Sequence, residues 1–449
     1  MASTYLNRTI GSSSTLSTKA TISFWVKKSL IDSSTNFYGI LSSNGGWNDG
    51  TGFAIGWRED LLVWYNLAEG SGLRTFTNRK FRDTSAFYHI VYKIDTTQAS
   101  MQDRVTLYVN GEDQGDLTSN GSITTAMPSQ NANLYYFLDN GDTCQISRGG
   151  NAGSTYFDGL MTHFHFIDGT AYPASTFGET DSLTGIWKPI TSPSVTYGTN
   201  GFFLKFASSG SMGTDSSGNS NNFTVNGNLT QTQDTPSNVF ATYNPLGNFF
   251  PADTFSNGNT TQTTNAGNYT YNISTLGASN GKYYCEIKNS TNNNNSIGIA
   301  DRPSISTTNG LTGTTYGWAY VMSGQVYNNG SIVATYNTVT TNDIVGIALD
   351  LDNNKVYFSK NGTWQGSSDP SAGTGGISIT APASNRTGFY FFGSGDEATN
   401  SAVHNANFGN GYFGTTAVAS AGTNASGIGI FEYDVPTGYT ALSTKGLNL

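Results

Sequence analysis

Two pairs of acidic residues in the chain can be tested as catalytic carboxylates for glycoside cleavage. That reaction needs two carboxyl groups about 5–9 Å apart, one protonated and one charged. Glu179 and Asp181 have the spacing that puts two side chains on one face of a strand, but their segment is expected to form a loop. Glu59 and Asp60 are adjacent, so in a strand they would face opposite sides. The sequence therefore predicts no catalytic residues and a protein that is not an enzyme.

Two histidines, His163 and His165, share one face of an expected strand, where their imidazoles could chelate zinc or nickel. Phe164 and Phe166 would occupy the opposite face of that strand. The chain has four histidines in all, and the other two lie far away in the sequence. We therefore favour a structural interpretation, in which the phenylalanines fill a core and the histidines line the second face of the sheet.

A short acidic segment offers hard oxygen ligands for calcium. Asp139 and Asp142 are separated by Asn-Gly, and Asp158 and Asp168 are further candidates. A complete calcium-loop signature does not occur, and Asn-Gly and Asp-Gly turns explain the same residues without an ion. No cofactor is therefore expected, with calcium at Asp139 and Asp142 as the alternative.

Aromatic side chains on loops provide chemistry that suits sugars, because their faces stack on C–H groups while neighbouring amides bond to hydroxyls. Trp47 is flanked by glycines and by Asn48 and Asp49, so it is expected on a loop. Trp364 follows Asn361-Gly-Thr and is expected at a loop tip. We predict ligand binding at Trp47, Asn48, Asp49 and Trp364. The remaining aromatic residues of this kind are predicted to lie in cores: Trp57, Trp64, Tyr65 and Trp318.

The composition of the 449-residue chain favours an all-β protein with polar loops. Charged residues make up 11%, against about 25% in a typical soluble domain. The chain has 54 Gly, 25 Tyr, 26 Phe and 7 Trp, and this aromatic content excludes a disordered chain. No stretch approaches the roughly 20 apolar residues of a membrane helix. The net charge of −9 and thinly spread Lys and Arg disfavour nucleic-acid binding.

Apolar runs with period-two alternation predict strands along most of the chain. The clearest run covers 20–27, where Ile22, Phe24 and Val26 share one face. Asn110-Gly111 favours a type I′ hairpin turn after another run.

Two series of such strands predict two β-sandwich domains. The first domain is expected over 1–205, a polar bridging segment over 206–250, and the second domain over 251–449. A compact hairpin is expected over 349–358, and the segment from Phe431 is expected to dock as a final strand. Two cysteines, Cys144 and Cys285, fall in different domains and are not expected to form a disulfide.

The first half resembles the concanavalin-A-like, laminin-G-like jelly-roll lectin family. The matching stretches are, in order, Ala20-Thr-Ile-Ser-Phe-Trp-Val-Lys, Tyr88-His-Ile-Val-Tyr, Val105-Thr-Leu-Tyr-Val-Asn-Gly and Tyr156-Phe-Asp-Gly-Leu-Met-Thr-His-Phe-His-Phe-Ile-Asp. The second half is similar to a SPRY domain over about 250–415. The residues that carry this similarity include Gly281-Lys-Tyr-Tyr-Cys-Glu-Ile, Ile297-Gly-Ile-Ala, Tyr316-Gly-Trp, Asp343-Ile-Val-Gly-Ile-Ala-Leu-Asp-Leu-Asp and Asn405-Ala-Asn-Phe-Gly. These resemblances imply binding modules, of glycans in the first half and of peptides or proteins in the second.

Several stretches also resemble tail- and capsid-associated proteins of marine bacteriophages. They are Ile167-Asp-Gly-Thr-Ala-Tyr, Phe177-Gly-Glu-Thr-Asp-Ser-Leu-Thr-Gly-Ile-Trp-Lys-Pro, Tyr197-Gly-Thr-Asn-Gly-Phe, Asp215-Ser-Ser-Gly-Asn-Ser-Asn-Asn-Phe and Tyr433-Asp-Val-Pro-Thr-Gly-Tyr-Thr-Ala-Leu. This resemblance implies a virion surface component, a tail fibre or capsid appendage that takes part in host adsorption.

The expected partners of such a component are other virion proteins, further copies of this chain in a homo-oligomer, and a host surface glycan or receptor. Nucleic-acid binding and membrane insertion are not expected. Because the N-terminal residues lack the pattern of a secretion signal, the protein is expected to be made in the host cytoplasm and to reach the virion surface. Two alternatives stay open: a purely structural decoration or assembly protein without a host ligand, and a polysaccharide depolymerase.

Overall fold

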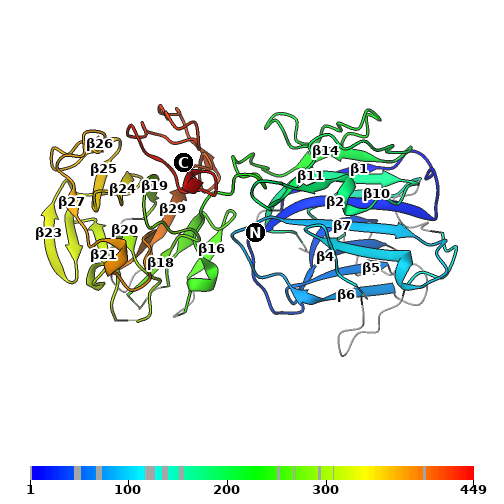
Figure 1. The fold of residues 1–449 in the computed structure, drawn as a ribbon, viewed down its shortest axis with the longest axis horizontal. Coiled ribbons are helices and arrows are strands. Elements are labelled where there is room, and N and C mark those ends of the chain that lie inside the picture. Colours follow the sequence, from blue (N-terminus) through cyan, green and yellow to red (C-terminus); the bar gives the residue numbers. More distant parts are fainter. Residues whose placement is uncertain are drawn as a thin grey trace. The chain divides into compact units, whose positions relative to one another are not determined.

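The computed structural model shows two compact units, residues 1–231 and 232–449 (Figure 1). It describes residues 3–44, 52–66, 73–115, 117, 127–133, 140–150, 156–249, 253–265, 267, 269–291, 295–306, 308–397 and 401–448. The helical elements in these ranges are short 3₁₀ turns: η2 (Gln102–Arg104), η3 (Ala174–Thr176), η4 (Pro245–Gly247), η5 (Leu311–Gly313), η6 (Pro382–Ser384) and η7 (Gly446–Asn448). Within the same ranges, no helix has the length and apolar character needed to span a bilayer. The all-β prediction is confirmed.

Two antiparallel sheets form the first unit. One sheet has the order β15 (Thr224–Asn226), β1 (Tyr5–Thr9), β10 (Thr143–Ile146), β3 (Tyr38–Ser43), β4 (Phe53–Arg58), β5 (Leu61–Asn66) and β6 (Leu73–Lys80). The other has the order β14 (Phe202–Leu204), β11 (Gly159–Asp168), β2 (Lys19–Lys28), β7 (Tyr88–Asp95), β8 (Val105–Val109) and β9 (Glu112–Asp113). A separate two-stranded ribbon pairs β12 (Gly178–Thr180) with β13 (Trp187–Pro189).

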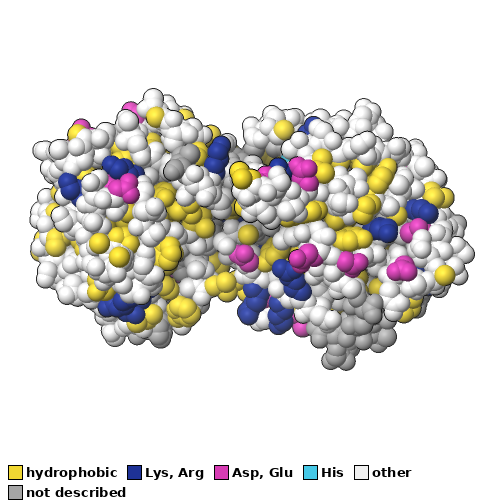
Figure 2. Space-filling view, viewed as in Figure 1, with side chains coloured by type: hydrophobic (Ala, Val, Ile, Leu, Met, Phe, Trp, Pro, Cys, Tyr) yellow, Lys and Arg dark blue, Asp and Glu magenta, His cyan; other side chains and the backbone are white. Residues whose placement is uncertain are grey.

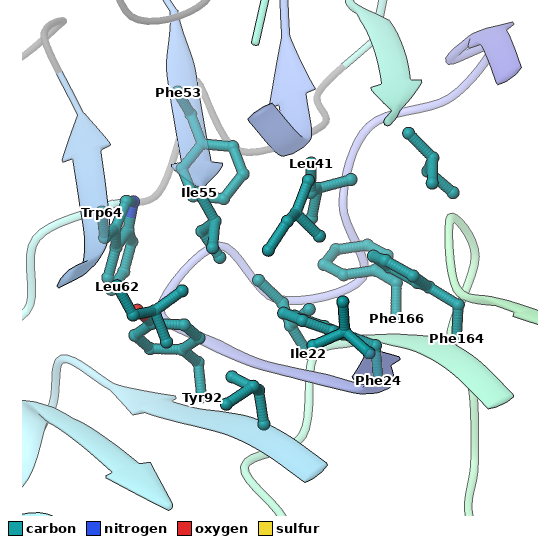
Figure 3. Close-up of a cluster of buried hydrophobic side chains, with 14 of the residues drawn as sticks. Ile22, Phe24, Leu41, Phe53, Ile55, Leu62, Trp64, Tyr92, Phe164 and Phe166 are labelled. Carbon is teal, nitrogen blue, oxygen red and sulfur yellow. The ribbon is translucent and has the colours of Figure 1, made fainter. Parts of the chain in front are cut away.

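The core of the first unit lies between its two sheets. Alternation in β2 directs Ile22 and Phe24 inward, and Phe24 stacks on Phe164 of β11 with 5.1 Å between ring centroids. Figure 3 shows side chains from both sheets pointing toward one another: Ile22, Phe24, Tyr92, Phe164 and Phe166 from one, and Leu41, Phe53, Ile55, Leu62 and Trp64 from the other. Each large apolar side chain buried in this way contributes about 1.5–3 kcal/mol. The predicted sandwich is therefore confirmed.

The turn between β8 and β9 follows the sequence prediction. Asn110 and Gly111 have φ values of 51° and 82°, and both positive values are what a type I′ turn requires. Val109 pairs with Glu112 directly across the two-residue loop. Asparagine and glycine tolerate the left-handed region best, so this dipeptide fixes the hairpin register.

The second unit is also a sandwich of two sheets. One has the order β16 (Thr254–Ser256), β17 (Thr261–Thr263), β29 (Val403–Asn407), β19 (Lys282–Asn289), β24 (Ile344–Asp350), β25 (Lys355–Lys360) and β26 (Thr363–Trp364), with β27 (Ile377–Ser378) on β25 and β32 (Thr440–Ala441) on β19. The other has the order β18 (Thr270–Ile273), β28 (Phe391–Asp396), β20 (Asn295–Ala300), β21 (Gly317–Val321), β22 (Gln325–Asn328) and β23 (Ser331–Thr335). A two-stranded ribbon pairs β30 (Tyr412–Phe413) with β31 (Thr416–Ala417). The predicted hairpin over 349–358 is formed by β24 and β25.

The segment expected to bridge the domains, 206–250, is divided between the two units. Its strand β15 pairs with β1 as the edge strand of one sheet and belongs to the first sandwich. Tyr243 is fully buried in the core of the second sandwich. The polar composition of this segment suggested a loop. The strand β15 is three residues long, and single buried residues such as Tyr243 show no periodic pattern, so neither could be recognised from the sequence.

A C-terminal cover lies on the outer face of the nine-stranded sheet. Strand β32 pairs in parallel with β19, as the prediction of a docked final strand required. Ahead of it, Phe431, Val435 and Tyr439 are buried against Tyr284 of β19. We refer to residues 428–442 as the C-terminal cover.

Candidate functional site

Most of the tryptophans considered for stacking on sugars are core residues. Trp57 and Trp64 are 1% exposed in the first sandwich, and Tyr65 is equally buried beneath the same sheet. Trp318 is 4% exposed in the second sandwich. The prediction that these four side chains fill cores is confirmed.

Trp364 lies in strand β26 and not at a loop tip. The hairpin turn is completed by Asn361 and Gly362, whose φ values are 48° and 79°, so Trp364 already pairs with Ser359 of β25. Its half-buried indole packs edge-on against Tyr284, with 6.3 Å between ring centroids. The expected loop position is thus corrected: the turn ends two residues earlier, and part of the ring supports the C-terminal cover. Ligand binding by its exposed part stays a prediction.

The other predicted site residues can be placed only in part. Residues 47–49 and Asp139 lie outside the described residues. Asp142 accepts hydrogen bonds from the Ile10 N–H at 2.8 Å through its main-chain oxygen and from the Asn44 amide at 2.7 Å through its carboxylate. No group of three or more His, Cys, Asp or Glu side chains suited to a metal ion occurs in the described part of the chain. Calcium at Asp139 and Asp142 stays the alternative to the prediction that no cofactor is bound.

Asp168, a further calcium candidate, is occupied by hydrogen bonds within the fold. Its carboxylate accepts from the N–H and hydroxyl of Thr15 and from the N–H of Asn200, at 2.9–3.1 Å. This residue therefore joins three segments of the first unit, which explains its position without an ion.

Glu179 and Asp181 share one lysine. Glu179 lies in strand β12 and not in the expected loop, because the segment pairs with β13. Lys188 of β13 is 3.5 Å from the Glu179 carboxylate and 2.9 Å from that of Asp181. The Lys188 ammonium and the N–H groups of the following turn hold the pKa of Asp181 well below its usual range. Asp181 is thus kept charged and is not the protonated carboxyl that glycoside cleavage needs.

His163 and His165 lie on the same face of β11, as predicted, although the strand is irregular there. His163 has a φ of 47°, and a β-bulge between Thr162 and His165 inserts one extra residue. His165 stacks on Phe203 with 3.8 Å between ring centroids, and its Nδ1 is 3.0 Å from the Tyr197 hydroxyl. Burial lowers the pKa of both histidines. The side chains therefore act as neutral packing and hydrogen-bonding groups.

His89 of β7 is the most tightly held histidine on this second face of the sheet. It lies between Trp25, at 4.5 Å between ring centroids, and Trp187, at 5.9 Å. The Trp187 indole N–H donates to Nδ1 at 2.9 Å, and Nε2 is 2.9 Å from the Ser23 hydroxyl. Burial lowers the pKa of His89 to about 3. No pattern in the sequence pointed to Trp187, because it comes from a distant ribbon.

In the second unit, Glu286 of β19 anchors the C-terminal cover. Its carboxylate accepts from the N–H groups of Glu432 and Tyr433, each at 2.8 Å, and from the Tyr284 hydroxyl at 3.0 Å. Burial raises the pKa of Glu286 to about 7, although these hydrogen bonds act in the opposite direction. The residue is structural, since the cover lies over it.

A small polar pocket of about 60 Å³ opens on the second unit. Arg302 lies in the loop after β20 and Arg386 in the loop before β28, and both line this pocket. The lining also includes Tyr271, Ser306, Asn309 and Thr315. These arginines were not singled out from the sequence. A usable signal exists, however: they are the only two arginines in residues 232–449.

Comparison with known families agrees with the two folds. Residues 3–175 match the model of the Concanavalin A-like lectin/glucanases superfamily, and residues 282–369 match the model of the SPRY domain. The chain thus carries a concanavalin A-like domain followed by a SPRY domain, and modules of these kinds suggest carbohydrate or protein binding. A search of curated proteins found no match to this chain.

Solved structures similar to part of the chain include several SPRY domains. The SPRY domain of human HERC1 is 18% identical with a TM-score of 0.31, covering 36% of this chain and 96% of that one. The TRIM65 PSpry domain is 12% identical with a TM-score of 0.28, covering 37% and 89%. Stonustoxin is 14% identical with a TM-score of 0.28, covering 37% and 27%. At these low identities and TM-scores, the similarities add nothing to the family matches.

Proposed function

We propose that this protein is a non-enzymatic component of a bacteriophage virion surface that binds a host glycan. The observation that carries the proposal is the presence of two binding-type sandwiches, a concanavalin A-like domain and a SPRY domain, in one chain. The resemblance of several stretches to tail- and capsid-associated phage proteins supports the virion location.

The surface chemistry suits contact with neutral or weakly charged polymers. Figure 2 shows a face on which charged side chains are few and most of the area is backbone or side chains that are neither charged nor hydrophobic. Serine, threonine and asparagine side chains offer both donors and acceptors to sugar hydroxyls. Shallow contacts of this kind are weak one by one, and many copies on a particle raise the overall affinity through effective concentration.

A non-enzymatic role is consistent with the state of the acidic residues. In the pair Glu179 and Asp181, the Lys188 ammonium lies near both carboxylates and holds the pKa of Asp181 well below its usual range. Release of reducing ends from bacterial polysaccharides incubated with the full chain would overturn this part of the proposal and favour a depolymerase.

The adhesive role is tested with the full-length chain on an array of bacterial surface polysaccharides. We expect saturable binding to at least one polysaccharide, stronger when the chain is displayed in many copies on beads. Absence of binding at every concentration and display density would overturn the adhesive role.

The virion location is tested separately, by labelling particles of the phage that encodes the chain with antibodies against it. Antibody labelling of the particles, together with no binding to any polysaccharide on the array, would favour a structural decoration protein. The burial of Trp57, Trp64 and Trp318 favours that second candidate, since these rings are not available to sugars.

A further inference from the structure

The pocket on the second unit gathers cationic groups that come from distant parts of the sequence. Arg302 and Arg386, the only arginines in residues 232–449, line the same small cavity. A chain with only 21 Lys and Arg in 449 residues has few such groups to bring together. Their convergence makes this cavity the strongest candidate for an anion site in the second unit.

The two guanidinium groups differ in how they are held. Arg386 lies 3.7 Å from the fully buried carboxylate of Asp301 and packs over the Tyr316 ring at 4.8 Å, which fixes its orientation. Arg302, by contrast, has no ion pair among the described residues, and its buried Nε has no hydrogen-bond partner there. A buried donor without a partner is costly, so Arg302 is poised to accept an anionic ligand.

Two carboxylates close to the lining residues have partners within the fold, although Oδ1 of Asp301 has no hydrogen-bond partner among the described residues. Asp301 pairs with Arg386, and Glu397 accepts from the N–H and the hydroxyl of Thr312, at 3.1 and 2.6 Å. Among the described residues that line the pocket, two carry guanidinium groups and none carries a carboxylate. A planar guanidinium is well suited to a carboxylate, because its N–H groups match the spacing of the two oxygens.

The rest of the lining points to a sugar as the carrier of the anion. Ser306, Asn309 and Thr315 contribute hydroxyl and amide groups, whereas Ile305 is the one large aliphatic side chain among the lining residues. A pocket for an apolar peptide side chain would show the opposite balance. Neutral donors and acceptors beside a guanidinium match the hydroxyls and carboxylate of an acidic sugar.

We propose that the pocket between Arg302 and Arg386 binds the carboxylate of a uronic-acid unit in an acidic polysaccharide. This inference rests on the proposed adhesive function, because that function supplies a host polysaccharide as the source of the sugar. At about 60 Å³, the pocket receives the carboxylate, while the rest of the sugar contacts the polar rim formed by Ser306, Asn309 and Thr315.

The test uses the full-length chain and defined oligogalacturonate in titration calorimetry at low and high salt. We expect binding that weakens with salt. Arg302→Gln should weaken it by about 10-fold or more, and Arg302→Lys should recover only part of that loss, because an ammonium lacks the fork geometry. Lys445→Gln, which removes an exposed charge from the same unit outside the pocket lining, should bind as the parent does.

The controls separate binding in this pocket from binding elsewhere on the chain and from loss of folding. Thermal unfolding of each variant verifies that it folds, and Arg302 is chosen over Arg386 because it has no partner to lose among the described residues. Equal binding by the parent and Arg302→Gln, or no binding of oligogalacturonate at all, would overturn the proposal. Preferential binding of a tetraglutamate peptide through Arg302 would replace the sugar with an acidic peptide.

The adhesive function and the pocket can fail independently. If neutral polysaccharides bind the chain and oligogalacturonate does not, the pocket assignment is overturned and the adhesive function stands. If oligogalacturonate binds through Arg302 but antibodies find no chain on the virion, the pocket is supported and the virion location is overturned.

Discussion

The Trp187 indole N–H donates to Nδ1 of His89 at 2.9 Å, and this one hydrogen bond fixes the protonation state of a buried histidine. An indole nitrogen can only donate, so Nδ1 must be the unprotonated nitrogen. The proton of the neutral ring is therefore on Nε2, which faces the hydroxyl of Ser23. Protonation of Nδ1 would break the contact with the β12–β13 ribbon, so the ribbon and the sheet face are coupled through this ring.

The first prediction concerns acid stability. The pKa of His89 falls from 6.5 to about 3 on folding, so the neutral ring contributes stability that is complete above pH 6.5 and is lost as the pH falls toward 3. In His89→Asn, the decline of the unfolding free energy with falling pH should be shallower by about 1.4 kcal/mol per pH unit in this window. Urea unfolding from pH 7 to pH 4 measures both slopes. Identical slopes would contradict the coupling.

A second prediction isolates the hydrogen bond itself. Trp187→Phe keeps an aromatic ring beside His89 but leaves buried Nδ1 without a donor, which should cost about 1–3 kcal/mol. Chemical denaturation at pH 7 measures the loss. The paired variant Trp187→Phe with His89→Phe removes both polar partners and should recover part of it, whereas additive losses would argue against the bond.

The third prediction contrasts two lysines of the first unit. Lys28 is buried, and its Nζ is 2.5 Å from Asp60, which is fully buried. Lys28→Met leaves that carboxylate without its closest cation and should cost about 3 kcal/mol or more. Lys188→Met serves as the control, because its exposed pairs with Glu179 and Asp181 should contribute almost nothing measurable. Equal losses from the two substitutions would contradict this ranking.

A fourth prediction concerns the C-terminal cover. Folding raises the pKa of Glu286 from 4.5 to about 7, so its contribution is complete below pH 4.5 and is lost as the pH rises through 7. The second unit should therefore unfold at lower urea concentration at pH 8 than at pH 5. Glu286→Gln should remove this dependence and lower stability, since one amide N–H₂ would face N–H donors of the cover. Tryptophan fluorescence, to which Trp318 and Trp364 of this unit contribute, follows the transition, and an unchanged pH dependence would count against the assignment.

Alternation of apolar residues and turn-forming residues in the sequence were sufficient to predict the longer strands and the two-sandwich architecture. The spacing of Ile22, Phe24 and Val26 predicts the inward face of β2 directly. Asn110-Gly111 predicts the turn between β8 and β9, because only certain residues tolerate positive φ. Such signals are local, and both were correct.

The features that escaped prediction depend on contacts between distant residues or on elements too short to show a pattern. The bulge at His163 follows from its partner strand, and the two-residue turn before Trp364 shifts that ring from a loop into a strand. The β12–β13 ribbon is too short to show a period. The Arg302–Arg386 pocket is formed only when two loops meet, so no spacing rule could reveal it.

The pairing of β32 with β19 also constrains how the protein is made. Residues that contact across this cover, such as Glu286 and Glu432, are 146 residues apart in the chain. During synthesis, the first unit can close once Asn226 has emerged to reach Asn7, well before the second unit is complete. The second unit must wait for its cover, leaving the apolar face around Tyr284 open to chaperones, or to neighbouring nascent chains, for most of its translation.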